Sequence, residues 1–387
     1  MHRSAHPLLR VWLLALCGAF FVLLWQFATV RANYGGNWTA LFTTGALEKQ
    51  PPVNAQEHVY LFAKSHGYDG QFYRYIAHDP FLRTDLKKYV DDPRLRYRRI
   101  LVPLLAYLLA AGRQDWIDPA YELVCLASIA LGVYWSCRIA QTSGIAAAWG
   151  LIFLALPAIA ITADRLVVDG ALAALTAAFV YYSASPSWKL FVVLALAALT
   201  RETGLLLVLA YCAYLAWRRE IRWAGIFVLS ILPAAAWNAY LAVKTPSAAY
   251  PFSLIPLSAI LHVLGHPWHY PPGTPFAGIV VAADYLALAG VLLAFGLALA
   301  VFVRSPADPV HIAAAFFAVM GLTFQRIDHW QNVYDFGRVY TPALACLAAV
   351  AARGRNPWLL LPMAMMLPRI AIQLAPQALG VIHWIIG

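Results

Sequence analysis

Residues 8–30 read LLRVWLLALCGAFFVLLWQFATV, a long apolar run in which Arg10 is the single charged residue. About 20 apolar residues in a helix span the hydrocarbon core of a bilayer, which is roughly 30 Å thick. The run follows His2 and Arg3, and no small-residue cleavage motif follows it. We therefore expect an uncleaved signal-anchor with its N-terminus in the cytoplasm.

Similar apolar runs recur along the whole chain, which is 62% hydrophobic and only 12% charged. A soluble domain usually carries about 25% charged residues. These proportions predict an all-α polytopic membrane protein, with residues 1–387 forming a single integral membrane domain of about eleven transmembrane helices. The predicted spans are 9–30, 119–137, 145–162, 167–183, 189–200, 204–217, 223–243, 278–303, 310–326, 339–352 and 357–372.

The orientation of these spans depends on the segment 100–111, which is apolar but too short to cross. At 1.5 Å per residue it covers roughly 18 Å, so we expect an interfacial or half-span helix. The cluster Arg218, Arg219 and Arg222 then lies in the cytoplasm, as the positive-inside rule requires. Residues 31–118 become a large first outer loop, and residues 244–276, rich in proline and histidine, become a second.

The basic charge and the cysteines narrow the choice of function. The net charge of +10 comes from lysines and arginines scattered at helix ends, which fits membrane orientation better than nucleic-acid binding. All five cysteines fall in apolar segments, so neither disulfides nor thiolate metal sites are expected. The basic run from Lys87 to Arg99 is expected to meet anionic lipid headgroups.

The stretch GYDGQFYRYIAHDPF, residues 67–81, is polar, acidic and aromatic and lies in the first outer loop. Glycines on both sides of Asp69 let a substrate approach closely, and a lone carboxylate can act as general base on a hydroxyl. The nearby rings, Tyr68 and Tyr73 among them, suit a sugar face or the lipid headgroups. Alternatively, Asp69 caps a helix that begins near Gly70 and ends before Pro80.

Three arginines are predicted at the outer ends of spans: Arg165, Arg201 and Arg338. A guanidinium group matches phosphate oxygens bidentately, so these residues are candidate phosphate ligands. Two of them also have a simpler explanation. Arg201 can pair with Glu202 in a tight turn, and Arg338 can be a snorkelling anchor. The predicted orientation places all three on the side of Asp69, which indicates one shared cavity facing the exterior.

A divalent metal is the open alternative for this cavity. His66, Asp69, His78 and Asp79 are possible ligands, but their spacing matches no closed metal site. We therefore expect no cofactor.

These residues together resemble the GT-C superfamily of membrane glycosyltransferases, near the phosphatidylinositol-glycan mannosyltransferases and the bacterial polyprenyl-phosphate-sugar transferases. The resemblance rests on one N-terminal span, the GlyTyrAspGlyGlnPheTyr motif, Arg165 with Asp169, and Thr200-Arg201. It implies that Asp69 is the catalytic base and that basic residues hold the phosphate of a polyprenyl-phosphate sugar. Arg201 and Arg338 are the closest matches and Arg165 the third, with Tyr68, Tyr73, His78 and Asp79 as further substrate-binding candidates. Where the family often has two adjacent acids, this chain has Asp69 alone, and Asp79 is the candidate for the second.

The expected function is therefore an inverting glycosyl transfer (an EC 2.4-type transferase) to a glycan, lipid or protein acceptor. The expected location is the cytoplasmic (inner) membrane of a bacterium, with the active site on the periplasmic face. The outer loops 31–66 and 244–276 would recognise the acceptor. The alternative is a transporter or flippase of a lipid-linked or anionic substrate, for which we would expect charges near the bilayer midplane and two related halves.

Overall fold

The computed structural model describes the chain except residues 1–6, 247–256, 267–269, 271–272, 274–275 and 324–326. Much of the predicted second outer loop, 244–276, lies outside the described residues. The rest is almost entirely helical, and its one sheet is the two-residue pair β1 (Thr44–Gly45) and β2 (Leu61–Phe62). The α-helical class predicted from composition is confirmed.

Five helical stretches of the described chain are long and apolar enough to cross a membrane. A sixth span is possible if the bent pair η3 (Ala147–Ala155) and α7 (Pro157–Arg165), at 62° to each other, counts as one. Eleven spans are not confirmed. The five stretches are α1 (Pro7–Asn33), α6 (Gln114–Thr142), α11 to α12 (Ile221–Val228 and Leu232–Lys244, joined by η5, Leu229–Ile231), α14 (Ala277–Arg304) and η6 to α18 (Pro357–Leu360 and Leu361–Ile386).

The other predicted spans form helices that are short or charged. A helix of 13 residues rises about 20 Å, less than the bilayer core. α17 is 22 residues long but carries Asp335, Arg338 and Arg353. The short or charged helices in the predicted spans are α8 (Asp169–Tyr182), α9 (Trp188–Thr200), η4 (Glu202–Gly204), α10 (Leu205–Trp217), α15 (Pro309–Leu322) and α17 (Val333–Gly354). Two further short helices are α13 (Ser258–Gly265) and α16 (Ile327–Gln331).

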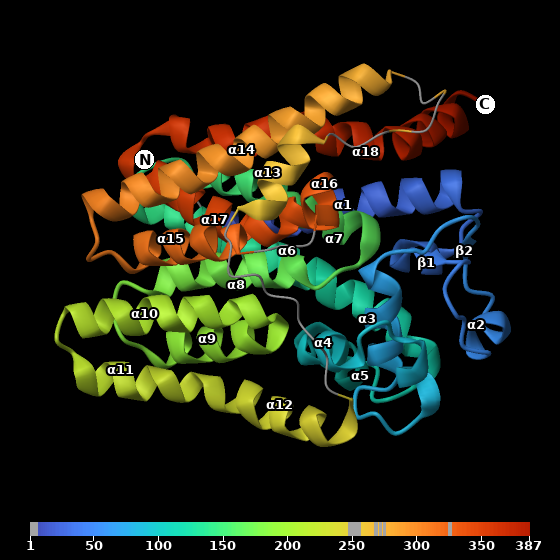
Figure 1. Ribbon diagram of the computed structural model, residues 1–387, viewed down its shortest axis with the longest axis horizontal. Helices are drawn as coiled ribbons and strands as arrows, with labels where there is room; N and C mark the ends of the chain where they lie inside the picture. Colours follow the sequence, from blue (N-terminus) through green and yellow to red (C-terminus); the bar gives the residue numbers. More distant parts are fainter. Residues whose placement is uncertain (1–6, 247–256, 267–269, 271–272, 274–275, 324–326) are drawn as a thin grey trace.

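Residues 31–118 form a folded cap at one end of the molecule, which we call the loop end (Figure 1). The expectation of a short helix over 100–111 is confirmed, because α5 has nine residues and rises about 14 Å. α5 packs on both α6 and α3. The cap consists of η1 (Trp38–Phe42), α2 (Val53–Gln56), α3 (Asp69–His78), η2 (Asp85–Tyr89), α4 (Pro93–Arg98) and α5 (Leu101–Leu109), with β1 and β2.

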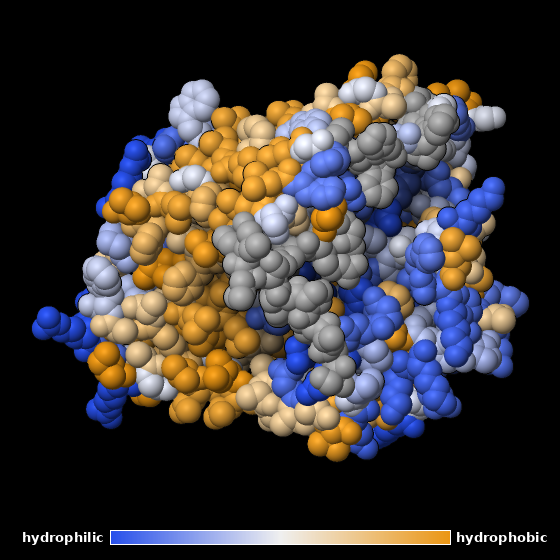
Figure 2. Space-filling view, viewed as in Figure 1, coloured by the Kyte–Doolittle hydropathy of each residue, from blue (hydrophilic) through white to orange (hydrophobic). Residues whose placement is uncertain are grey.

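The apolar and the hydrophilic parts of the surface lie over different parts of the molecule. Figure 2 shows a broad apolar face over the helical bundle and a hydrophilic region over the cap. Many large apolar side chains of α1 are exposed, including Phe20 at 64% and Phe21 at 66%. Apolar surface on this scale indicates contact with lipid.

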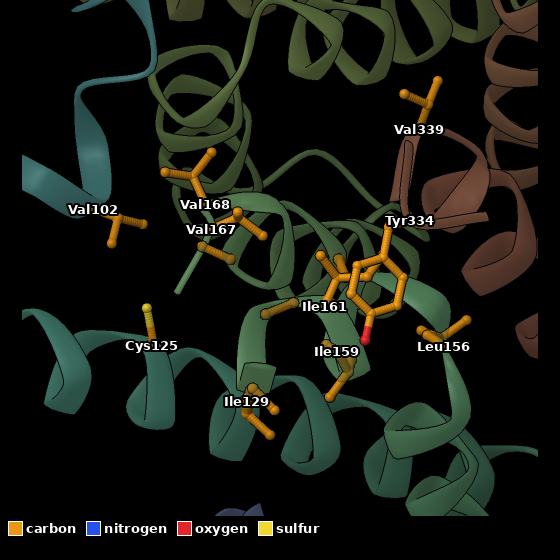
Figure 3. Close-up of a cluster of buried hydrophobic side chains, with 14 of the residues drawn as sticks. Val102, Cys125, Ile129, Leu156, Ile159, Ile161, Val167, Val168, Tyr334 and Val339 are labelled. Carbon is orange, nitrogen blue, oxygen red and sulfur yellow. The ribbon is translucent and has the colours of Figure 1, made fainter. Parts of the chain in front are cut away.

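An apolar cluster lies beneath the loop end and fixes the helices that meet there (Figure 3). The members labelled in Figure 3 come from α5, α6, α7 and α17 and from the turns before and after α7. Val167 and Val168 are fully buried and immediately precede Asp169, and the buried Val339 follows Arg338. Packing of these apolar neighbours therefore sets the directions of the Asp169 and Arg338 side chains.

Candidate functional site

Asp69 lies at the centre of a cluster of buried charges at the loop end. Its Oδ2 atom is 2.6 Å from Nη1 of Arg338 and 2.7 Å from Nη1 of Arg96, and Nη1 of Arg99 is 4.0 Å away. The Asp69 side chain is only 10% exposed. Among the described residues, every recorded ion pair of Asp69 falls on Oδ2, so Oδ1 remains available as an acceptor.

The start of α3 explains how Asp69 reaches this position. Gly67 has φ +76°, a backbone conformation that residues with a side chain rarely adopt. This turn leads the chain into α3, whose first residue is Asp69. Gly70 lies against backbone oxygens of Arg165 and Phe42, where a Cβ would not fit. α3 ends at His78, before Pro80, as the sequence predicted.

Arg96 and Arg99 are functional candidates that the sequence reasoning missed. Arg96 ends up between Asp69 and Asp91, and Arg99 donates to both oxygens of Glu202 at 2.6 and 3.0 Å and to Tyr73 Oη at 2.9 Å. Both side chains are buried or nearly so, at 12% and 6% exposed, so they do not meet lipid headgroups. One sequence feature could have identified them, which is their spacing of three residues at the end of α4. Residues at i and i+3 share a helix face.

Arg338 connects Asp69 with α17 and α8. Its Nη2 lies 3.2 Å from Asp335, one helical turn earlier, and its guanidinium stacks 5.0 Å from the Tyr68 ring. The Tyr68 hydroxyl donates to Asp335 at 2.9 Å. Arg338 is therefore a buried, doubly paired residue and not a snorkelling anchor.

Arg201 pairs with Asp169, the first residue of α8, rather than with its neighbour Glu202, which is 3.9 Å away. Three atoms here are buried without a hydrogen-bond partner among the described residues: Asp169 Oδ2, Arg201 Nε and Arg338 Nε. Asp169 Oδ2 lies 3.9 Å from Nη1 of Arg338. Unsatisfied buried polar groups are rare, so this part of the cluster has room for a second arrangement of its bonds.

Arg165 lies at the edge of the cluster. It pairs with Asp164 at 3.2 Å, and its guanidinium is 4.9 Å from the Tyr68 ring and 5.1 Å from the Tyr334 ring. It thus contacts the site through Tyr68, with 21% of its side chain exposed.

His78 and Asp79 do not join Asp69. They follow it by a whole helix, about 14 Å along the axis. His78 contacts Asp118 and Gln114, and Asp79 accepts from the backbone of Arg83 and Thr84. Asp79 is therefore not the second acid. The carboxylates that share Arg338 with Asp69 are Asp335, at 3.2 Å, and Asp169, at 3.9 Å.

The predicted metal ligands His66, Asp69, His78 and Asp79 do not converge either. A different trio, Glu57, His78 and Asp118, has ligand atoms within 4.8 Å of one another. Arg74 donates to both Glu57 and Asp118, so its guanidinium supplies the positive charge between them. This arrangement ties the cap to α6.

The electrostatics of the central cluster follow from its composition. Four carboxylates (Asp69, Asp169, Glu202 and Asp335) face four guanidinium groups (Arg96, Arg99, Arg201 and Arg338). Burial alone would raise the pKa of Asp69, but the adjacent Arg338, Arg96 and Arg99 outweigh it and hold that pKa far below its usual range. Asp69 is therefore ionised at neutral pH.

No family model, no curated protein and no solved structure matches this chain.

Proposed function

We propose that the protein is an inverting glycosyltransferase that moves a sugar from a polyprenyl-phosphate donor to a hydroxyl group outside the membrane. The single observation that carries this proposal is the environment of Asp69. One carboxylate oxygen is clamped by Arg338 and Arg96, and the other has no recorded partner among the described residues. An oriented, ionised carboxylate with a free oxygen is the arrangement that a general base needs.

The transfer step follows from this arrangement. Oδ1 of Asp69 takes the proton of the acceptor hydroxyl while the acceptor oxygen attacks the anomeric carbon. The bond from that carbon to the donor phosphate breaks, and its electron pair leaves with the phosphate. Attack opposite the leaving group inverts the anomeric centre. The acceptor, by this proposal, is a glycan, a lipid or a protein.

Arg338 controls the strength of the base in this mechanism. While Arg338 remains on Asp69, the carboxylate is a weak base. A shift of its Nη1 toward Asp169 Oδ2, now 3.9 Å away, gives that oxygen a hydrogen-bond partner and raises the proton affinity of Asp69. Arg201 and Arg165 are each paired with a carboxylate in this structure, so they stabilise departing phosphate only after a similar exchange.

The test is native mass spectrometry of the lipids that copurify with wild-type protein and with Asp69→Asn. Asparagine keeps the size of the side chain but accepts no proton. We expect the variant to retain a polyprenyl-phosphate sugar that the wild type has consumed. Asp85→Asn is the matched control, because Asp85 belongs to the same cap but is 76% exposed. It should behave as wild type.

The proposal fails if Asp69→Asn and the wild type, both folded by thermal unfolding, carry no such lipid. A lipid-linked or anionic substrate retained equally by both proteins, without conversion, would instead favour the transporter or flippase alternative.

A further inference from the structure

Three aromatic rings meet where the cap joins the end of α1. The Tyr34 ring lies 5.1 Å from the Tyr60 ring and 5.5 Å from the Phe62 ring, and the rings of Tyr60 and Phe62 are 5.0 Å apart. All three side chains are only partly buried. They belong to the cap, whose surface is largely hydrophilic (Figure 2). Partly exposed rings in such a surface offer apolar faces to a ligand that arrives from water.

Polar groups with unused hydrogen-bonding capacity lie beside the Tyr34 ring. Nε2 of Gln377 donates to the Tyr34 hydroxyl at 3.2 Å and to Asp164 Oδ1 at 2.6 Å. No acceptor among the described residues is recorded for the hydroxyl hydrogen of Tyr34. The other atom of the same amide, Gln377 Oε1, is buried without a partner in the described part of the chain. A free donor and a free acceptor therefore lie next to each other.

The close approach of α18 to the end of α1 fixes the position of Gln377. Gly380, three residues after Gln377, lies against the side chain of Asn33 and leaves no room for a Cβ. Nδ2 of Asn33 donates to the backbone carbonyl of Gln377 at 3.1 Å. The amide of Gln377 is thus held between two helices and does not depend on a surface loop.

Arg165 extends this polar surface to the reacting carboxylate. Its Nε donates to Asp164 at 3.2 Å, and no hydrogen bond with a described residue is recorded for its two Nη groups. Its guanidinium lies 4.9 Å from the Tyr68 ring, and that ring lies 5.0 Å from the guanidinium of Arg338. Tyr68 immediately precedes Asp69. The surface beside the three rings is therefore continuous with the site of the proposed transfer.

These groups suit a carbohydrate. A sugar ring has a face of C–H groups that packs on an aromatic ring, and an edge of hydroxyls that both donate and accept. The three rings supply the apolar faces, and Tyr34, Gln377 and Arg165 supply donors and an acceptor. A neutral hydroxyl can use the free Nη groups of Arg165 and leave its pair with Asp164 intact. A lipid chain, in contrast, would leave these polar groups without partners.

We propose that the face formed by Tyr34, Tyr60, Phe62, Arg165 and Gln377, which we call the Tyr34 face, binds an oligosaccharide. This proposal rests on the proposed function, because it makes the acceptor a glycan rather than a lipid or a protein. Sugar units pack on the rings. The hydroxyl at the end of the glycan next to Tyr68 is the one that loses its proton to Oδ1 of Asp69 in the proposed transfer.

The experiment is saturation-transfer NMR on the full-length protein in a detergent without a sugar headgroup. The probes are three unbranched trisaccharides: maltotriose, cellotriose and mannotriose. At least one should receive saturation from the wild type, and its titration gives a Kd. Tyr60→Leu stays apolar but loses the flat ring, and it should weaken binding roughly tenfold. Tyr34→Phe removes only the hydroxyl and should weaken binding about two- to tenfold.

Trp116→Ala is the matched control. It removes an aromatic ring that is 56% exposed near the start of α6, outside the Tyr34 face, and should bind as the wild type does. Thermal unfolding shows which variants are folded, and if one of the two Tyr34-face variants is not, the other decides. Failure of all three sugars to bind the wild type would overturn the proposal. So would wild-type affinity in the folded Tyr60→Leu and Tyr34→Phe proteins.

This test is separable from that of the proposed function. Asp69→Asn should bind the same trisaccharide as the wild type, whether or not it accumulates a lipid-linked sugar. Trisaccharide binding by an Asp69→Asn protein that accumulates no such lipid would leave a carbohydrate site and remove the transferase. Accumulation of the lipid without trisaccharide binding would leave the transferase and remove the Tyr34 face.

Discussion

Asp69 shows how opposing physical terms act on one carboxylate. Burial disfavours its charge, while three arginines favour it more strongly, so its pKa lies far below the usual value. A carboxylate with a depressed native pKa stabilises the fold above its unfolded pKa, about 3.9 for Asp, and this contribution is lost as the pH falls below that value.

The first prediction is therefore that the difference in unfolding temperature between wild type and Asp69→Asn depends on pH. The wild type should unfold at the higher temperature between pH 5 and 8, and its advantage should shrink below about pH 4. Thermal unfolding of the detergent-purified proteins across this range measures it, with the exposed Asp85→Asn as control. A constant advantage down to the lowest pH would contradict the paired, ionised state of Asp69.

The second prediction concerns Arg338, which is 5% exposed and paired with both Asp69 and Asp335. Arg338→Ala leaves buried carboxylates short of a partner and should destabilise the protein by about 3–5 kcal/mol. Arg218→Ala removes an arginine that is 54% exposed and should leave stability nearly unchanged, because solvent screens its ion pair with Glu220. Chemical denaturation of both variants measures the difference. Equal effects would mean that the Arg338 pairs contribute little.

At the scale of elements, the site depends on how α3 docks against the end of α7. Gly70, next to Asp69, faces the carbonyl oxygen of Arg165, and a Cβ there would also lie 2.8 Å from the carbonyl oxygen of Phe42. Neither backbone atom can move without moving its own helix. α3 can therefore approach α7 this closely only with glycine at that position.

The third prediction follows from this contact. Gly70→Ala should destabilise the protein by about 1–3 kcal/mol through overpacking, and it should shift Asp69 away from Arg338. A misplacement of about 1 Å would lower the proposed glycosyl transfer roughly 100-fold. Gly225→Ala on α11 is the control, because no atom lies within 4 Å of the added Cβ. Unfolding and the copurified lipid profile measure the two effects, and a Gly70→Ala protein equal to the control would contradict the docking.

At the scale of the whole molecule, the broad apolar face and the hydrophilic cap indicate how the protein lies in a membrane (Figure 2). The Arg218–Arg222 turn leads into α11, and the α11–α12 stretch runs from there to Lys244, next to the cap. The cap and this turn therefore lie at opposite ends of one predicted span.

The fourth prediction is that these two ends are on opposite sides of the membrane. A membrane-impermeant maleimide should label Asp85→Cys in intact cells, but Arg222→Cys only after the membrane is opened. The wild-type chain, with Cys17 exposed, Cys212 half-buried and Cys125, Cys137 and Cys346 buried, gives the background. Labelling of both positions from the same side would contradict the proposed orientation.

The sequence by itself determined the helical class, the long apolar stretches and the short α5, because these depend on local composition and length. It also identified Asp69 and the arginines Arg201 and Arg338, which the structure brings into one cluster. Charged residues beside apolar runs need partners, so their presence alone suggested that they would meet.

Only the tertiary structure decided which charges pair. It excluded His78 and Asp79 from the cluster and brought in Arg96 and Arg99. It also paired Asp169 with Arg201 and bent the stretch that the sequence predicted as one span over 145–162. Pairs such as Asp69 with Arg338 are separated by most of the chain, and no local pattern specifies them. Packing of the apolar neighbours, Val167, Val168 and Val339 among them, sets these distances, because a side chain points wherever its close-packed backbone is held.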